Sequence, residues 1–337
     1  MLIAGFDIGG TKCSVILADV KGEKIDFISR DEIPTEGNWK TIIDTLIEKI
    51  SGSLHRFGLK QEDIKKAGIS CGGPLDSKKG MIMSPPNLKG WDNVPICSYI
   101  SEKLNVSASL MNDADACAVA EWKFGAGRGY ENIIFLTFGT GLGAGLILNG
   151  RLYTGTNNMA GEVGHIRLSS EGPVGYGKRG SFEGFCSGGG IAQQAKTYFT
   201  EKLQMGLICP LCPDFETLKE LTAKDIVLAA DRGDEDAIEI LDRTGRYFGL
   251  GLSVLIDILN PEIIIAGGVF MRGHKHIEKS MAEVLEKEAL ALSLKHCKIV
   301  PSELNEKIGD YGAISAALCG LRHRGVQADL RHNVRGI

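Results

Sequence analysis

The spacing of hydrophobic residues alternates along the chain between two patterns. Short runs dominated by apolar residues, such as 2–8 and 13–20, are typical of β-strands. Between 38 and 57 the apolar residues instead recur every three or four positions, which places them on one face of a helix. We expect strands at 2–8, 13–20, 24–33, 65–70 and 106–113, and helices at 38–57, after Pro95 and at 114–127.

The second half of the chain repeats the opening in kind. Residues 132–150 have the pattern of strand, glycine-threonine turn and strand, as do residues 2–22, which suggests an internal duplication. A long helical pattern follows, and then an apolar strand that ends in glycines. We expect a helix at 234–260, strands beginning at 262 and at 297, and a final helix at 309–323. Alternating strands and helices predict an α/β protein.

Composition narrows the classes of function. The 337 residues allow two domains of ordinary size, and a net charge of −4 favours neither nucleic acid nor a membrane surface as a partner. No apolar run approaches the roughly 20 residues of a membrane span, and the N-terminus lacks the features of a signal peptide. We read the basic stretch 322–337 as a solvated tail and expect a cytoplasmic protein.

The nine cysteines are scattered along the chain, so we expect reduced thiols that are mostly buried as small apolar residues. Cys209 and Cys212 have a spacing known from metal sites. However, no nearby Cys or His pair supplies the two further ligands of a zinc site. A loop with two thiols is the preferred interpretation.

Glycine-rich turns carry the first candidate chemistry. Glycine has no Cβ, so the backbone N–H groups of such turns can approach an anion closely, and threonine adds a hydroxyl donor. An acidic residue beside a phosphate requires a cation between them, which points to Mg²⁺ with a nucleotide, held by Asp7 through water and phosphate. A single such turn would be read as a hairpin, whereas two copies favour a nucleotide site. The candidates are Asp7, Gly9, Gly10, Thr11 and Lys12, then Gly139, Thr140 and Gly141, and finally Gly267 and Gly268, where strand-to-helix packing is almost as good an explanation.

Polar residues gather in two further places. The stretch 161–184 holds Glu162, His165 and Glu183 among glycines, and its pattern alone leaves a metal site, a ligand pocket and a solvated loop open. Asn112 and Asp113 lie where a strand meets a helix, a position that also suits a helix cap.

Nine segments in order resemble the ROK sugar kinases, a family of the hexokinase, actin and Hsp70 superfamily. They are DIGGTK, GISCGGPLD, PPNLKGW, NDADACAVAEWKFGAG, FGTGLGAGLILNG, GEVGH, GSFEGFCSGGGI, NPEIIIAGGV and GDYGAISAAL. The resemblance implies a two-domain actin-like ATPase (ribonuclease-H-like) α/β fold, with mixed sheets flanked by helices and a central cleft. It implies a small domain at 1–112 plus 310–337 and a larger one at 113–309.

The resemblance also implies an activity, the ATP-dependent phosphorylation of a hexose at its 6-hydroxyl with Mg²⁺ as cofactor. Asp113 would be the general base, and Glu121 matches a recurrent family residue that we read as structural. The implied sugar contacts are Gly72, Gly73, Asn87, Asn112, Glu162, His165 and Glu183. Glucose is the expected substrate, and N-acetylmannosamine or N-acetylglucosamine is the alternative. A sugar-binding transcriptional regulator is a weaker alternative, because Asp113 is present and no winged helix precedes the first strand. Relatives are commonly dimers, so a homodimer is expected.

The chain departs from the family at one segment. Many ROK kinases hold a structural zinc with the histidine of GEVGH and three cysteines of a CxCGxxGCxE segment. The three cysteine positions are Val174, Tyr176 and Ser181 here, so only His165 remains. We therefore expect no structural zinc, and a loop that is held by packing of Tyr176 and Phe182 and by hydrogen bonds of Ser181.

Overall fold

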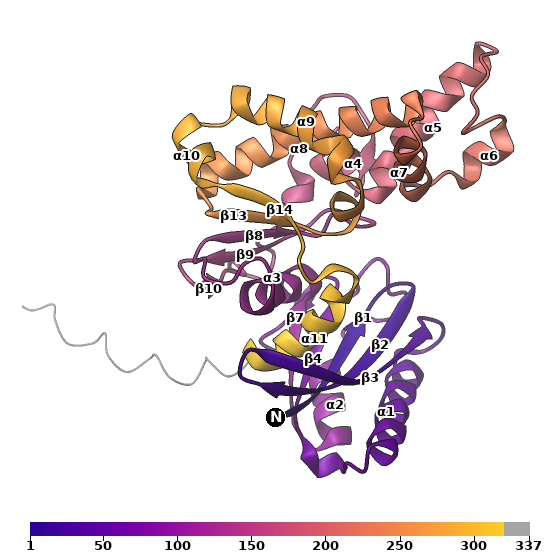
Figure 1. Ribbon diagram of the computed structural model, residues 1–337. Helices are drawn as coiled ribbons and strands as arrows, with labels where there is room; N and C mark the ends of the chain where they lie inside the picture. Colours follow the sequence, from indigo (N-terminus) through magenta and orange to yellow (C-terminus); the bar gives the residue numbers. More distant parts are fainter. Residues whose placement is uncertain (320–337) are drawn as a thin grey trace, which may run out of the picture. The chain divides into compact units, whose positions relative to one another are not determined.

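The N-terminal strands form a five-stranded sheet with the order β3-β2-β1-β4-β7 (Figure 1). The first three strands pair antiparallel through tight turns, whereas β4 and β7 follow helices and pair in parallel. The computed structural model describes residues 1–319. The strands of this sheet are β1 (Leu2–Ile8), β2 (Lys12–Lys21), β3 (Lys24–Pro34), β4 (Ile64–Cys71) and β7 (Ser107–Asn112), and β5 (Leu75–Asp76) and β6 (Met81–Ile82) form a separate hairpin.

Helices cover both faces of this sheet. Successive residues of a strand point to opposite faces, and Leu2, Ala4 and Phe6 share one core with α1 and α2. Gly5 lies on the other face against α11, because a Cβ there would come 3.1 Å from the Cβ of Ala313. The helices are α1 (Trp39–Arg56), α2 (Ile96–Leu104), α3 (Asp113–Phe124) and α11 (Ile308–Cys319).

A second sheet repeats the topology of the first, with the order β10-β9-β8-β13-β14. Read across the sheet in this order, the first two pairs of strands are antiparallel and the last two are parallel, as in the first sheet. The duplication predicted from the two glycine-threonine stretches is therefore matched in strand order and direction. The strands are β8 (Ile133–Leu136), β9 (Ala144–Leu148), β10 (Arg151–Leu152), β13 (Ile263–Ala266) and β14 (Lys298–Pro301).

The second sheet is accompanied by a helical layer whose longest member is α8. The Asp234 side chain caps this helix by accepting from the backbone N–H of Ala237 at 2.9 Å, and Asn260 ends it in the left-handed conformation. Apolar side chains of α8, such as Phe248 and Leu252, are fully buried in this core. The helices are α4 (Phe182–Phe185), α5 (Gly188–Gln204), α6 (Phe215–Glu220), α7 (Ala223–Asp231), α8 (Glu235–Leu259), α9 (Gly268–Glu288) and α10 (Ala291–His296).

The described chain divides into two units, each with its own hydrophobic core. The first unit is Met1–Ala120 together with 309–319, and the second is Glu121–Ile308. This division falls inside α3, whereas the boundary expected after residue 112 lies directly before this helix. The expected architecture of two mixed sheets flanked by helices is confirmed. The end of the predicted final helix and the basic stretch 322–337 lie outside the described residues.

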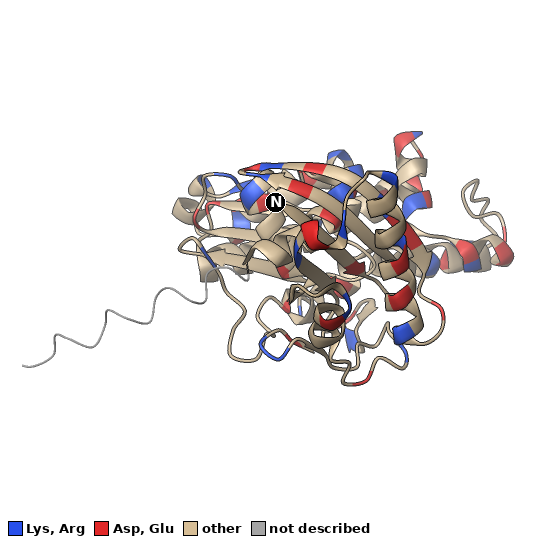
Figure 2. Cartoon of the chain, turned by 90° about the horizontal axis from the view of Figure 1, so that it is seen from below, with Lys and Arg blue, Asp and Glu red and all other residues tan. Residues whose placement is uncertain are grey.

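Charged side chains of both signs are interspersed over the helices and strands of the described chain (Figure 2). Among residues 1–319, no helix combines the length and the apolar character that crossing a membrane requires.

Candidate functional site

The β1–β2 turn forms the first candidate phosphate site, in the first unit. The N–H of Gly9 donates to the carbonyl of Lys12 at 3.1 Å, and the Thr35 hydroxyl donates to the carbonyl of Gly9 at 2.7 Å, so the turn is fixed from two sides. Gly10 lies directly against the loop that carries Asn87, because a Cβ on Gly10 would come 2.7 Å from the Asn87 Cβ. The structure therefore brings the predicted nucleotide turn and one predicted sugar residue together.

Lys12 is already paired in this structure. Its ammonium group lies 2.9 Å from Glu32, which also pairs with Arg30 at 2.8 Å. The Nε of Arg30 donates to both oxygens of Asp310 at 3.0 and 3.1 Å. Charges of alternating sign thus run from β2 across β3 to α11, and Lys12 would have to leave Glu32 to reach a phosphate.

Asp7 lies beside the N-terminus of α11 and carries an unusual carboxylate. A Cβ on Gly309 would come 2.6 Å from Oδ2 of Asp7, so the helix begins directly against this carboxylate. Burial raises the pKa of Asp7 to about 6. The charges of Asp113 and Asp310 also raise this pKa, while Arg30 lowers it. A cation at this place would relieve the repulsion among the three carboxylates.

Asn112 and Asp113 cap α3, as the sequence suggested. The N–H of Ala114 donates to Oδ1 of Asn112 at 3.0 Å and to Oδ1 of Asp113 at 2.8 Å. Asp113 is exposed on one side. The protein surrounds the rest of its carboxylate, and the loss of hydration there raises its pKa. Gly72 and Gly73 lie alongside, since a Cβ at Gly72 would come 3.8 Å from Oδ2 of Asp113.

The second glycine turn, in the second unit, is held by a predicted sugar residue. The N–H of Leu142 donates to Oε2 of Glu183 at 3.0 Å. A Cβ on Gly141 would come 2.7 Å from the same oxygen, so a larger residue there would push the carboxylate away from its place at the turn. Glu183, 41 residues further along the chain, is therefore part of the turn's own structure.

Two helices of the second unit begin at this turn. The N–H of Gly188, the first residue of α5, donates to the carbonyl of Gly139 at 2.7 Å, and the N–H of Gly189 donates to the carbonyl of Thr140 at 3.4 Å. Gly268, the first residue of α9, lies against Phe138, because a Cβ there would come 2.0 Å from its carbonyl oxygen. The third predicted glycine segment thus adjoins the second.

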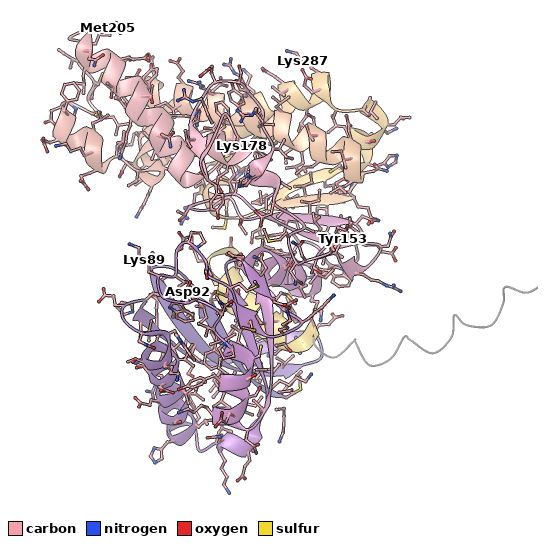
Figure 3. The ribbon with its side chains drawn as sticks, turned by 180° about the vertical axis from the view of Figure 1, so that it is seen from behind. Lys89, Asp92, Tyr153, Lys178, Met205 and Lys287 are labelled. Atoms are coloured by element: carbon pink, nitrogen blue, oxygen red, sulfur yellow. The ribbon has the colours of Figure 1, made fainter. Side chains whose placement is uncertain are left out.

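Glu162 and His165 lie within one short turn. The N–H of His165 donates to the carbonyl of Glu162 at 3.1 Å, and the 3₁₀ turn between them covers Val163–His165. Both side chains are exposed. The Lys178 ammonium, labelled in Figure 3, donates to the carbonyl of His165 at 2.6 Å.

The segment at the positions of the family's zinc cysteines is held by protein contacts. Ser181 accepts from the N–H of Gly184 at 3.1 Å and donates to the carbonyl of Gly175 at 3.4 Å, and Phe182 is fully buried. Tyr176 packs edge-on against His165 with ring centroids 5.2 Å apart. The hydrogen bonds predicted for Ser181 and the packing predicted for Phe182 are present, whereas Tyr176 is 65% exposed and its ring contacts His165.

Cys209 and Cys212 are both buried in the core of the second unit, and the N–H of Cys212 donates to the carbonyl of Cys209 at 3.1 Å. The two thiols therefore help to fill the core, although their backbone forms a turn.

Glu121 is fully buried and accepts three hydrogen bonds within the second unit. The donors are the N–H of Ala126 at 2.8 Å, the N–H of Leu304 at 3.0 Å and the hydroxyl of Ser302. Through these hydrogen bonds the Glu121 carboxylate links α3 to the segment that precedes α11. The interpretation of Glu121 as structural is supported by these contacts.

The candidate residues form two groups, one in each unit. Arg30, Glu32 and Lys178 were not predicted from the sequence. Their partners Asp310, Lys12 and His165 lie 280, 20 and 13 residues away, and no short motif joins the members of a pair. Asp310 could have been found, because it lies in the family-like segment GDYGAISAAL.

Comparison with known proteins gives the family. The ROK family model matches residues 3–319. A glucokinase from Halalkalibacterium halodurans is 33% identical over 294 residues, which are 85% of this chain and 86% of the relative. A xylose repressor from Caldicellulosiruptor bescii is 28% identical and covers 94% of this chain, with 78% of its own length matched. Among solved structures, a ROK family glucokinase from Streptomyces griseus in complex with glucose and AMPPNP has a TM-score of 0.76 at 27% identity, covering 95% of this chain and 100% of that one. The chain belongs to the ROK family.

Proposed function

We propose that this protein is an ATP-dependent sugar kinase that phosphorylates a hexose, glucose in the first place, at the 6-hydroxyl. The observation that carries the proposal is the carboxylate of Asp113. It is accessible at the first residue of α3, and its pKa is raised by lost hydration. A carboxylate that is open to a substrate and more basic than usual suits a general base.

Asp113 would accept the proton of the attacking hydroxyl, because its carboxylate needs only to reach the hydroxyl hydrogen. Sugar hydroxyls both donate and accept, so a sugar site needs acceptors and donors of several kinds. The assigned sugar contacts are the side chains of Asn87, Asn112, Glu162, His165 and Glu183 and the backbone of Gly72 and Gly73. Oε2 of Glu183 accepts from Leu142, and Oε1 has no hydrogen bond within residues 1–319, so Oε1 is the oxygen that would contact a ligand in this assignment.

The residues of the first unit fit a Mg²⁺ nucleotide. The negative charges of Asp7, Asp113 and Asp310 outnumber the one positive charge of Arg30 beside them. These carboxylates are not arranged to ligate one metal ion together, since no group of three metal-ligating side chains is found among residues 1–319. A cation there would take one protein carboxylate, Asp7, and complete its shell with water and phosphate. ATP with Mg²⁺ would supply the phosphoryl group. The assigned nucleotide residues are Asp7, Gly9, Gly10, Thr11, Lys12, Gly139, Thr140, Gly141, Gly267 and Gly268.

The similarity to glucokinases and the glucose and AMPPNP bound by the Streptomyces griseus protein support glucose and ATP. N-acetylmannosamine and N-acetylglucosamine are the alternative acceptors. The similarity to a xylose repressor supports a second candidate function, that of a sugar-binding regulator. A cytoplasmic location and a homodimer are part of the proposal and rest on the family alone.

A coupled ADP-release assay over glucose, mannose, fructose, allose and the N-acetylhexosamines tests this function. We expect turnover with one of these sugars, and a loss of about 10²–10⁴-fold in kcat for Asp113→Asn with sugar binding retained. Calorimetric titration of the same sugars is the control. Sugar binding without ATP-dependent turnover by the wild-type protein would refute the kinase and favour the regulator. Turnover that survives Asp113→Asn would remove Asp113 from the mechanism.

A further inference from the structure

The hairpin β11 (Val174–Gly175) and β12 (Lys178–Arg179) has an unfavourable residue at its tip. The two turn residues, Tyr176 and Gly177, have φ values of +44° and +74°. Two-residue hairpins with this conformation prefer Asn-Gly, because a left-handed conformation costs other L-residues roughly 1–2 kcal/mol. Burial does not explain the tyrosine, since 65% of its surface is exposed.

Within residues 1–319, the ring of Tyr176 packs against one other ring, that of His165. The two rings meet edge-on at 71° with centroids 5.2 Å apart, a favourable arrangement for aromatic pairs. The same hairpin contacts His165 a second time, because the ammonium group of Lys178 donates to its carbonyl at 2.6 Å. One contact restrains the ring of the histidine and the other restrains its backbone.

The hairpin is itself firmly fixed. The Gln193 side chain of α5 accepts from the N–H of Val174 at 2.7 Å and donates to its carbonyl at 3.2 Å. Ser181 donates to the carbonyl of Gly175 at 3.4 Å from the start of α4. Tyr176 therefore extends from a rigid support, as a residue that orients another side chain must.

We propose that Tyr176 is a positioning residue that holds the His165 imidazole in its sugar-binding orientation, with Lys178 fixing the backbone of the same histidine. The proposal rests on the proposed function, in which His165 contacts the sugar. It explains why a strained tyrosine occupies a place where asparagine would be more stable: asparagine would relieve the backbone and lose the ring contact.

Tyr176→Asn tests this, with Tyr176→Phe as the matched control that keeps the ring. For Tyr176→Asn we expect a melting temperature equal to or above that of the wild type and a sugar KM raised about two- to tenfold, the worth of one aromatic pair. The KM for ATP should stay unchanged and kcat should stay within about twofold. Tyr176→Phe should match the wild type throughout. An unchanged sugar KM in Tyr176→Asn, or an equal rise in both variants, would overturn the proposal.

The orientation of His165 can also be read without turnover. Its ring protons, assigned by comparison with His165→Gln in the NMR spectrum, should shift in Tyr176→Asn because they lose the ring current of the tyrosine, and should stay in place in Tyr176→Phe. An unmoved resonance in Tyr176→Asn refutes the positioning role. Absence of sugar turnover in the wild type refutes the proposed function instead, so the two failures are distinguishable.

Discussion

Replacing Asp7 by asparagine should make the protein more stable at neutral pH while it abolishes activity. The pKa of Asp7 stands at about 6 in the folded chain, against an ordinary value of 3.8, chiefly because the carboxylate is buried and secondarily because Asp113 and Asp310 lie near. The ionised form is therefore disfavoured by folding. A pKa difference of one unit between the folded and the unfolded chain corresponds to about 1.4 kcal/mol of stability. The ionised Asp7 carboxylate therefore lowers the free energy of unfolding by about 3 kcal/mol.

The pH dependence follows from the direction of this pKa change. Below about pH 4 Asp7 is protonated in both the folded and the unfolded chain, and no penalty exists. As the pH rises through 4 to 6 the unfolded chain ionises first, so the wild type loses stability, and above about 6 the full penalty remains. The asparagine side chain does not titrate, so the stability gained by Asp7→Asn should be largest above pH 6 and should vanish near pH 4.

Urea unfolding followed by tryptophan fluorescence measures this gain. Trp39 and Trp91 lie in the first unit with Asp7, and Trp122 lies in the second, so a Trp122→Phe background restricts the signal to the first unit. Asp92→Asn, at an exposed aspartate labelled in Figure 3, is the control for the same chemical change. A midpoint at pH 8 that Asp7→Asn does not raise, or a gain that persists at pH 4, would refute the electrostatic reasoning.

Three further outcomes are expected. Activity should fall about tenfold per pH unit below about pH 6, because Asp7 must be ionised to hold a cation; a pH profile of kcat/KM that stays flat to pH 5 contradicts this. Glu121→Gln should destabilise the second unit by about 1–3 kcal/mol, since an amide cannot accept from Ala126 on one side and from Leu304 on the other; urea unfolding compared with Glu303→Gln, at an exposed glutamate, measures it. EDTA followed by excess Mg²⁺ should leave activity intact and elemental analysis should find no stoichiometric zinc, whereas one tightly held zinc per chain would direct attention to Cys209 and Cys212.

Local patterns predicted most of the sheet strands and the long helices. Strands such as Leu2–Ile8 and helices such as Glu235–Leu259 lie within a few residues of their expected bounds, because their apolar spacing alone specifies the element. The helices between 182 and 231 were not expected. They are short or begin with glycines, as at Gly188, so their formation depends on tertiary packing more than on periodicity.

The candidate site was less accessible to sequence reasoning. The family-like segments selected Asp113, Glu183 and the glycine turns, but they gave no sign of what each side chain contacts. Arg30 on an edge strand pairs with Asp310 across 280 positions, and neither has a local motif for that pairing. Contacts between residues so far apart in the chain depend on the fold of the whole unit. A short stretch of sequence therefore does not predict them.

The two sheets show how one topology can support different chemistry at equivalent places. Both carry a glycine-threonine turn after an apolar strand. Two positions before the first glycine of the turn stands Asp7 in the first sheet but Thr137 in the second, where its hydroxyl accepts from the N–H of Gly143 at 3.0 Å. Only the first turn can therefore present a carboxylate to a cation. The second turn instead receives a carboxylate from outside, because Glu183 accepts from Leu142. In the proposed assignment the first turn contributes the metal ligand and the second a preformed backbone cradle. Calorimetric titration should therefore show that Asp7→Asn weakens the binding of Mg²⁺ with nucleotide and spares the sugar, whereas Glu183→Gln weakens sugar and nucleotide binding together.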